Sequence, residues 1–311
     1  MNNKVTGTTL NRRIVRNWQM YVFLFLPLLY LFIFCYYPML GLQLAFKEFD
    51  MGKGMWGSPW VGLSQFRRFL TSPMFSRVFR NTLTISLYNL FAGFPIPIIF
   101  ALLLNSERSV KFRKVVQTVT YLPHFISIVV MVGILLQIFN SRIGIYGTLH
   151  MALYKIYPED MLGKARVFPH LYVWSDIWKT FGWSSIIYFA ALSSVSQELY
   201  EAAEIDGANR FRRVIHIDFP SILPTATIML ILRAGQVLSV GYEKALLMQN
   251  SLNLSTSEII STYVYKVGFG ASGIPNYSYS TAIGLFNSAI NLIMLVLVNK
   301  ISSKMSETSL W

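Results

Sequence analysis

Long uncharged runs, separated by short charged segments, dominate the chain. The clearest run lies at residues 19–40, and two others cover residues 81–104 and 117–140. A helix of about 20 apolar residues crosses a hydrocarbon core of ~30 Å, because it rises about 1.5 Å per residue. Each run is therefore predicted to be a membrane-spanning helix. Pro95 and Pro97 are expected to kink the second one, since each lacks a backbone N–H donor.

Three further spans are predicted in the second half of the chain. The fourth, at residues 170–195, contains Asp176 and Lys179, and the fifth, at 221–242, contains Arg233. The sixth lies at 277–299, within an uncharged stretch. The pattern predicts an all-α fold, a polytopic membrane bundle of six transmembrane helices that forms a single domain over residues 1–311.

The composition excludes an ordinary soluble enzyme. Of 311 residues, 54% are hydrophobic and 13% are charged, against about 25% charged in a soluble domain. The net charge of +13 does not indicate nucleic-acid binding, because the basic residues border apolar runs, where they meet anionic membrane lipid. The single cysteine, Cys35, excludes a disulfide within the chain.

The placement of basic residues bears on orientation. An even number of spans leaves both termini on one side of the membrane. Arg16 directly precedes the first span, and Lys111, Arg113 and Lys114 lie in the short connection after the second. Basic residues are enriched in short cytoplasmic segments, so both termini are predicted to be cytoplasmic, although the total counts on the two sides are nearly equal.

A segment before the second span alternates aromatic and basic residues. Residues 64–80 read SQFRRFLTSPMFSRVFR. This alternation is typical of a short helix that lies in the headgroup region. Phe66, Phe69 and Phe75 are expected to dip into the apolar layer.

The polar segment at residues 197–220 is better organised than a connector needs to be. Glu198, Glu201 and Glu204 recur every three residues, which predicts a helix with an acidic face. Gly207 permits a turn that a residue with a Cβ resists. A basic helical turn follows, and Pro220 precedes the fifth span. The segment is therefore predicted to form a helix, a glycine turn and a second helix.

The same segment resembles the signature of permease subunits of bacterial ABC importers. Glu-Ala-Ala at 201–203 is followed at the family spacing by Gly207, Ile217 and Pro220, with Phe219 where leucine is usual. Residues 62–66, 81–83 and 121–123 resemble the carbohydrate-uptake branch related to the maltose transporter. Residues 241–244 and 278–287 resemble a narrower group that imports oligosaccharides released from polysaccharides.

This resemblance implies a type I permease fold in the bacterial cytoplasmic membrane. It implies that segment 197–220 is cytoplasmic and docks on a dimeric ATPase, which would bind ATP and Mg²⁺. This chain contains no GxxxxGK[ST] phosphate-binding motif and is expected to bind no cofactor and to be no enzyme. The resemblance also implies a second homologous permease and an extracytoplasmic solute-binding protein. The coupling positions that it assigns are Glu201, Ala202, Ala203, Asp206, Gly207, Ala208, Ile217 and Pro220.

Candidate substrate contacts follow from the cost of polar groups in a membrane. Arg233 has no opposite charge in its own span, so it is expected to face either the substrate, such as a uronate, or the second permease. Asp176 and Lys179 are expected to pair on one helix face. Aromatic and amide side chains that could hold a sugar, or simply pack, are Trp174, Trp178, Tyr242, Asn287 and Asn291, with Glu243 as a candidate at an outer gate.

Other functional classes fit the sequence less well. An ATP-independent carrier or channel for a small polar solute has no use for a docking segment. A membrane enzyme is disfavoured, because no carboxylate pair or Ser/His/Asp set converges and the four histidines lack metal-ligand spacing. Amino-acid and peptide permeases share the docking segment, and only the other resemblances argue for sugar.

Overall fold

The computed structural model describes residues 15–270 and 273–305. Both chain ends lie outside this part. The prediction that they are cytoplasmic therefore concerns residues that the structure does not describe. Within the described part no strand forms, apart from an isolated bridge between Lys47 and Trp60, which confirms the all-α fold. The α-helices are α2 Trp18–Leu31, α3 Gly54–Gly57, α4 Ser64–Leu70, α5 Pro73–Gly93, α6 Pro95–Asn105, α7 Val110–Tyr121, α8 Ile128–Ile138, α9 Ile145–Tyr154, α10 Phe168–Ser193, α11 Gln197–Ile205, α12 Arg210–Arg213, α13 Phe219–Ala234, α14 Tyr242–Met248, α15 Leu254–Ser257, α16 Ile260–Gly268 and α17 Tyr277–Met305.

Short π and 3₁₀ segments link several of these helices. A π segment at Phe32–Tyr36 and a 3₁₀ segment at Tyr37–Phe46 extend α2. A 3₁₀ turn at Leu122–Phe125 follows α7, and a π segment at Val214–Asp218 joins α12 to α13. This last segment lies just before Pro220, which lacks the N–H of a regular helical bond.

In the described part of the chain, four continuous helical stretches are long and apolar enough to cross a membrane. The pair α7 and α8 gives a fifth candidate, bent by 100°. Helix α10 has 26 residues, long enough to span, but it carries Asp176 and Lys179 and is more polar than the others. The membrane bundle is thus present, while the count of six spans stays a prediction. The four stretches are Trp18–Phe46, Pro73–Asn105, Arg210–Ala234 and Tyr277–Lys304.

Two predicted spans differ from the observed helices. The run at 117–140 is not one straight helix, because Pro123 interrupts α7 and the hydroxyl of Ser127 caps a new helix, accepting from the Val130 amide at 3.3 Å. The helix expected at 221–242 ends at Ala234. Beyond it, the chain leaves the helical path and the Leu238 amide donates to the side chain of Asn291 at 2.9 Å.

The predicted headgroup helix at residues 64–80 is also corrected. Ser72 caps a new helix at Pro73, so the segment divides between α4 and the first turns of α5. Phe69 is only 1% exposed, and its ring lies within 6.5 Å of the rings of Phe75, Tyr263 and Phe286. Phe69 is therefore a core residue that joins α4 to α16 and α17, and not a membrane anchor.

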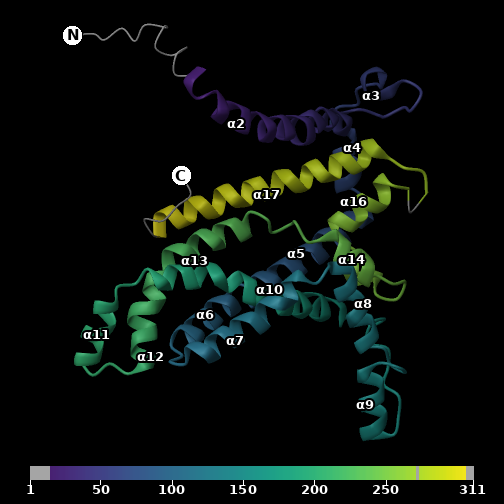
Figure 1. Ribbon diagram of the computed structural model, residues 1–311. Coiled ribbons are helices and arrows are strands. Elements are labelled where there is room, and N and C mark those ends of the chain that lie inside the picture. The colour runs from purple at the N-terminus through teal and green to yellow at the C-terminus, as the bar shows by residue number, and fades with distance from the viewer. Residues whose placement is uncertain (1–14, 271–272, 306–311) are drawn as a thin grey trace, which may run out of the picture.

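Helix α10 is central to the packing. One buried cluster around Val173 and Ile177 joins it to α5, α8 and α14, and another around Tyr188 and Leu192 joins it to α6 and α13. At Gly182 the backbone of α7 comes so close that a Cβ would lie 2.2 Å from a carbonyl oxygen. Figure 1 shows α10, α13 and α17 running across the bundle, with α11 and α12 at one end, α4, α14 and α16 at the other, and α9 projecting away from the body.

Candidate functional site

Helices α11 and α12 form a compact knob, here residues 197–213, at one end of the bundle (Figure 1). The hydroxyl of Ser196 caps α11, accepting from the Glu198 amide at 3.2 Å. At its C-terminal end, the amide of Ala208 donates to the carbonyl of Ala203 at 2.8 Å, and that of Gly207 to Glu204 at 3.0 Å. These two bonds make a Schellman motif, which requires a left-handed residue, and Gly207 has φ of +72°. The local sequence therefore dictates the turn.

Side-chain contacts fix the knob to the bundle. Arg213 pairs with Glu204 at 3.0 Å and ties the two helices together. The hydroxyl of Tyr200 donates to the carboxylate of Asp218, which is 2% exposed and also accepts from Asn105 at 3.3 Å. Burial and the neighbouring carboxylate raise the pKa of Tyr200 to about 12, so it remains a donor at neutral pH. Through Asp218 the knob is thus joined to the start of α13 and to the end of α6.

The predicted coupling positions divide into three groups. Glu201, Ala202, Asp206 and Gly207 are exposed on the knob, whereas Ala203 and Ala208 are half-buried in the Schellman turn. Ile217 and Pro220 lie beyond the knob, Ile217 in the π segment Val214–Asp218 and Pro220 in the first turn of α13.

Sequence reasoning missed the apolar surface of the knob. Ile205 is 87% exposed and Phe211 is 71% exposed, on either side of the glycine turn, and Leu199 is exposed as well. Large apolar side chains exposed on such a polar projection form a candidate contact surface. The sequence signal for this surface was the presence of large apolar residues in an otherwise charged segment.

A cavity of about 360 Å³ lies within the bundle, between α5, α10, α13 and α14. We name it the inner cavity. Three charged side chains line it: Asp176, Arg233 and Lys244. The guanidinium of Arg233 is 6.0 Å from the ring centre of Phe94. Within the described part, Arg233 forms no ion pair. The polar lining of the inner cavity also includes Ser86, Asn89, Thr180, Ser184, Gln236 and Ser239.

The ion pair in this cavity is not the predicted one. Asp176 pairs with Lys244, from α14, at 3.4 Å, and not with Lys179 on its own helix. The ammonium of Lys244 also donates to the carbonyl of Tyr172 at 2.7 Å and lies 4.4 Å from the centre of that ring. Asn89 donates to the other carboxylate oxygen of Asp176 at 3.1 Å. The pair therefore links α5, α10 and α14.

Of the predicted substrate contacts, only Arg233 lines the inner cavity. Trp174 donates to the hydroxyl of Tyr88 at 2.8 Å, while Tyr242 stacks on Tyr265 with ring centres 5.6 Å apart. Asn291 bonds to the backbone and side chain of the 238–239 turn. Trp178 and Glu243 are exposed, and the buried Oδ1 of Asn287 finds no partner in the described part of the chain. The structure does not bring these residues together as one site.

Metal ligands are a separate question. Among residues 15–270 and 273–305, no group of three His, Cys, Asp or Glu side chains is placed to hold a metal ion.

Residues 93–307, which include the knob and most of the inner cavity, match the family described as the binding-protein-dependent transport system inner membrane component. The chain belongs to this family. The permease is 42% identical to protein LplB of Bacillus subtilis (strain 168), over 95% of this chain and 92% of the relative. It is 37% identical to the polygalacturonan/rhamnogalacturonan transport system permease protein YteP of the same organism, over 96% and 92% of the two chains.

A solved structure agrees with the fold. The permease superposes with a TM-score of 0.86 on a chain of a bacterial alginate ABC transporter in complex with an alginate pentasaccharide-bound periplasmic protein. The two chains are 35% identical, and the match covers 96% of this chain and 99% of the other. The predicted membership of the ABC importer permeases is confirmed, and the chain is an inner membrane transport component.

Proposed function

We propose that the permease forms one half of the translocation pathway of an ATP-driven importer of oligosaccharides, including acidic, uronate-containing ones. A second homologous permease would form the other half. A separate ATPase dimer would bind ATP and Mg²⁺, and an extracytoplasmic solute-binding protein would deliver the sugar. The observation that carries this proposal is the exposed knob at residues 197–213 in a chain of the permease family.

The knob has the properties that energy coupling requires. Its exposed apolar side chains, Ile205 and Phe211, offer a surface on which another protein can dock. The contacts of Asp218 with Tyr200 and Asn105 transmit a displacement of the knob to α6 and α13. Helix α13 carries Arg233 of the inner cavity, so movement of the knob would reach a group placed to meet the substrate. This assignment makes the knob cytoplasmic, and with it both termini.

The substrate class is supported by relatives and by charge. Polygalacturonan is a polymer of uronate units, and the structural relative imports the acidic polysaccharide alginate. In the permease, the inner cavity carries two cations and one carboxylate, and Arg233 is the cation without an ion pair among the described residues. A unit of positive charge in a membrane cavity suits a carboxylate-bearing sugar. The solute-binding partner is supported by the periplasmic protein in the alginate transporter complex.

The first experiment is to tag the chain in its native cell, extract it in mild detergent and identify the proteins that copurify by mass spectrometry. Recovery of a second permease and of an ATPase with a Walker motif is the expected result. Recovery of the chain alone, as a stable and monodisperse species, would instead support an ATP-independent carrier.

The coupling role is tested by Gly207→Asp in the reconstituted complex. The new side chain would project from the docking surface at a backbone position with φ of +72°, where nothing else lies within 4 Å of a Cβ. We expect the complex to assemble in the membrane but to lose its sugar-stimulated ATPase activity. Gly62→Asp is the matched control, because Gly62 has φ of +58°, is equally open and lies outside the knob. Normal stimulation in Gly207→Asp would refute the coupling role.

A further inference from the structure

A second cavity, of about 540 Å³, lies between the first turns of α5, the start of α10 and α15. We name it the outer basin. Its volume is within the ~300–1,000 Å³ of small-molecule sites. Helix α5, which supplies most of the lining, packs against α4 and α16, and these two helices lie at the end of the bundle opposite the knob (Figure 1). In the proposed orientation it therefore opens on the extracytoplasmic side.

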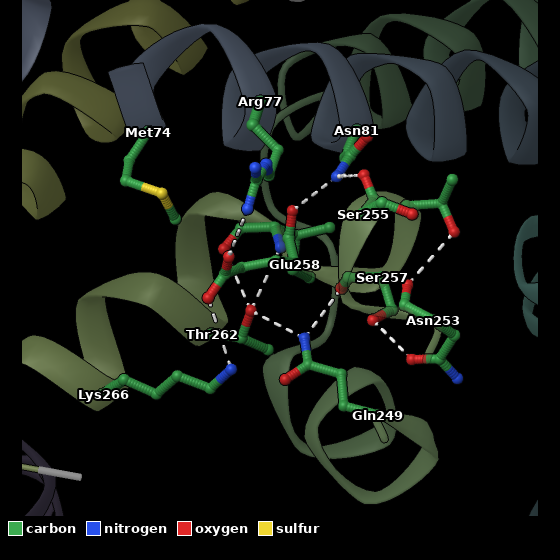
Figure 2. A network of polar contacts seen from close by, with 12 residues as sticks. Met74, Arg77, Asn81, Gln249, Asn253, Ser255, Ser257, Glu258, Thr262 and Lys266 are labelled. Atoms are coloured by element: carbon green, nitrogen blue, oxygen red, sulfur yellow. Dashed lines mark hydrogen bonds and ion pairs between the residues drawn. The ribbon is translucent and has the colours of Figure 1, made fainter. Parts of the chain in front are cut away.

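The outer basin carries an excess of positive charge. Arg77 and Arg80 line it, and its lining within the described residues contains no acidic side chain. Glu258, the carboxylate that pairs with Arg77 at 4.0 Å, is 7% exposed and also pairs with Lys266 at 3.3 Å. Figure 2 shows Arg77 and Lys266 reaching Glu258 from two directions. Two cations thus share one carboxylate, and Arg80 has no ion pair among the described residues.

The rim of the basin is held rigidly. Asn81 donates to the carbonyls of both Ser255 and Glu258, at 3.0 and 2.9 Å, and fixes α5 against α15 (Figure 2). The hydroxyl of Thr256 donates to the carbonyl of Ala165. By contrast, the side chains of Ser76, Arg80, Thr84 and Ser255 form no hydrogen bond or ion pair within the described part of the chain. A fixed frame with free donors is suited to a ligand with several hydroxyls and a negative charge.

The outer basin adjoins the inner cavity. Ile85 lines both, so its buried side chain separates them along α5. Pro73 to Ile85 border the basin, and Ile85 to Gly93 border the inner cavity. The two cavities therefore adjoin at Ile85.

We propose that the outer basin is a binding site for the carboxylate of a uronic acid unit, with Arg80 and Arg77 as its cationic contacts and the hydroxyls of Ser76, Thr84 and Ser255 as sugar contacts. The proposal rests on the proposed function for the identity of the sugar. An acidic oligosaccharide binds first in the outer basin. It enters the inner cavity when the side chain of Ile85 moves aside. A guanidinium pairs with a carboxylate in a bidentate manner, which a neutral sugar cannot use.

The test is saturation-transfer NMR with trigalacturonate on the purified importer complex, in phosphatidylcholine nanodiscs without the solute-binding protein. Arg80→Gln should raise the Kd for trigalacturonate about tenfold, because a hydrogen bond to a charged group is lost. The Kd for the fully methyl-esterified trisaccharide should be unchanged. Arg67→Gln is the matched control, since Arg67 is exposed on neighbouring α4 and does not line the basin.

Three results would overturn the proposal. One is an unchanged Kd for trigalacturonate in Arg80→Gln while Arg233→Gln abolishes binding, which would place the sugar in the inner cavity alone. Another is equal weakening of the acid and the methyl ester. The third is weaker binding of the empty solute-binding protein to Arg80→Gln complexes, with sugar binding intact, which would make the basin a protein contact. The binding measurement needs neither ATP nor delivery of the sugar by the solute-binding protein. Loss of the basin site can therefore be distinguished from failure of the proposed transport function.

Discussion

The Asp176–Lys244 pair offers a quantitative test, because its two members differ in burial. Lys244 is 3% exposed, whereas the side chain of Asp176 keeps 32% of its surface exposed toward the inner cavity. At 3.4 Å and an effective dielectric constant of ~20, their attraction is about 5 kcal/mol before desolvation is subtracted. The two single substitutions are therefore expected to have unequal costs.

Asp176→Asn removes the counter-charge of the buried Lys244 ammonium and leaves it only neutral partners, the Tyr172 carbonyl and ring and the new amide oxygen. This loss should lower the free energy of unfolding by about 3–5 kcal/mol, the cost of an uncompensated buried charge. Lys244→Met replaces the cation by an apolar side chain of similar length, and Asp176 keeps Asn89 and its access to solvent. Its cost should be about 1–2 kcal/mol, between the values for exposed and buried pairs.

The assay is unfolding of the purified permease in mixed micelles by titration with sodium dodecyl sulfate, followed by circular dichroism. The double variant Asp176→Asn/Lys244→Met should be close to Lys244→Met alone, since the stranded charge is gone. Lys179→Met makes the same chemical change on α10 but removes neither member of the pair, and it takes away a cation that repels Lys244, so it should be neutral or slightly stabilising. A larger loss in Lys244→Met than in Asp176→Asn, or an equal loss in Lys179→Met, would refute the reasoning.

Two further substitutions test the packing around the knob and α10. Tyr200→Phe removes the donor to the buried carboxylate of Asp218 and should lower the free energy of unfolding by about 1.5–3 kcal/mol in the same titration. Gly182→Ala places a Cβ 2.2 Å from the carbonyl oxygen of Thr120 and should cost about 1–3 kcal/mol by forcing α7 from α10, whereas Gly133→Ala, with nothing within 4 Å, should be neutral or stabilising. An unchanged Tyr200→Phe, or equal effects at the two glycines, would contradict these contacts.

The knob was predictable because its determinants are local. A left-handed glycine at position 207, small residues at 203 and 208 and an Asn cap at 209 all act within one or two helical turns. Long apolar runs likewise revealed the bundle, because a hydrocarbon core imposes its own length on a helix.

The features that escaped the sequence depend on distant partners. Lys244 lies 68 positions from Asp176, and a nearer lysine at 179 satisfied the simplest helical spacing. Beyond the end of α13, Asn291 accepts from the Leu238 amide across 53 positions, which no local pattern predicts. Pro123 could be read from the sequence as a helix breaker. The 100° bend depends also on Ser127, which caps the N-terminus of α8. A partner far along the chain decided the first two cases, and a local serine cap decided the third.

The helical stretch Trp18–Phe46 has two parts with different surroundings. Throughout α2 no side chain is buried, although the stretch is as hydrophobic as the other candidate spans. The 3₁₀ segment Tyr37–Phe46 instead packs against α17 and α4, and its Ala45 is fully buried. The described part of the chain thus holds this stretch at its C-terminal end alone. The apolar surface of α2 is left for lipid or for another subunit to cover, so its orientation in the membrane is set by those contacts and not by the fold of this chain.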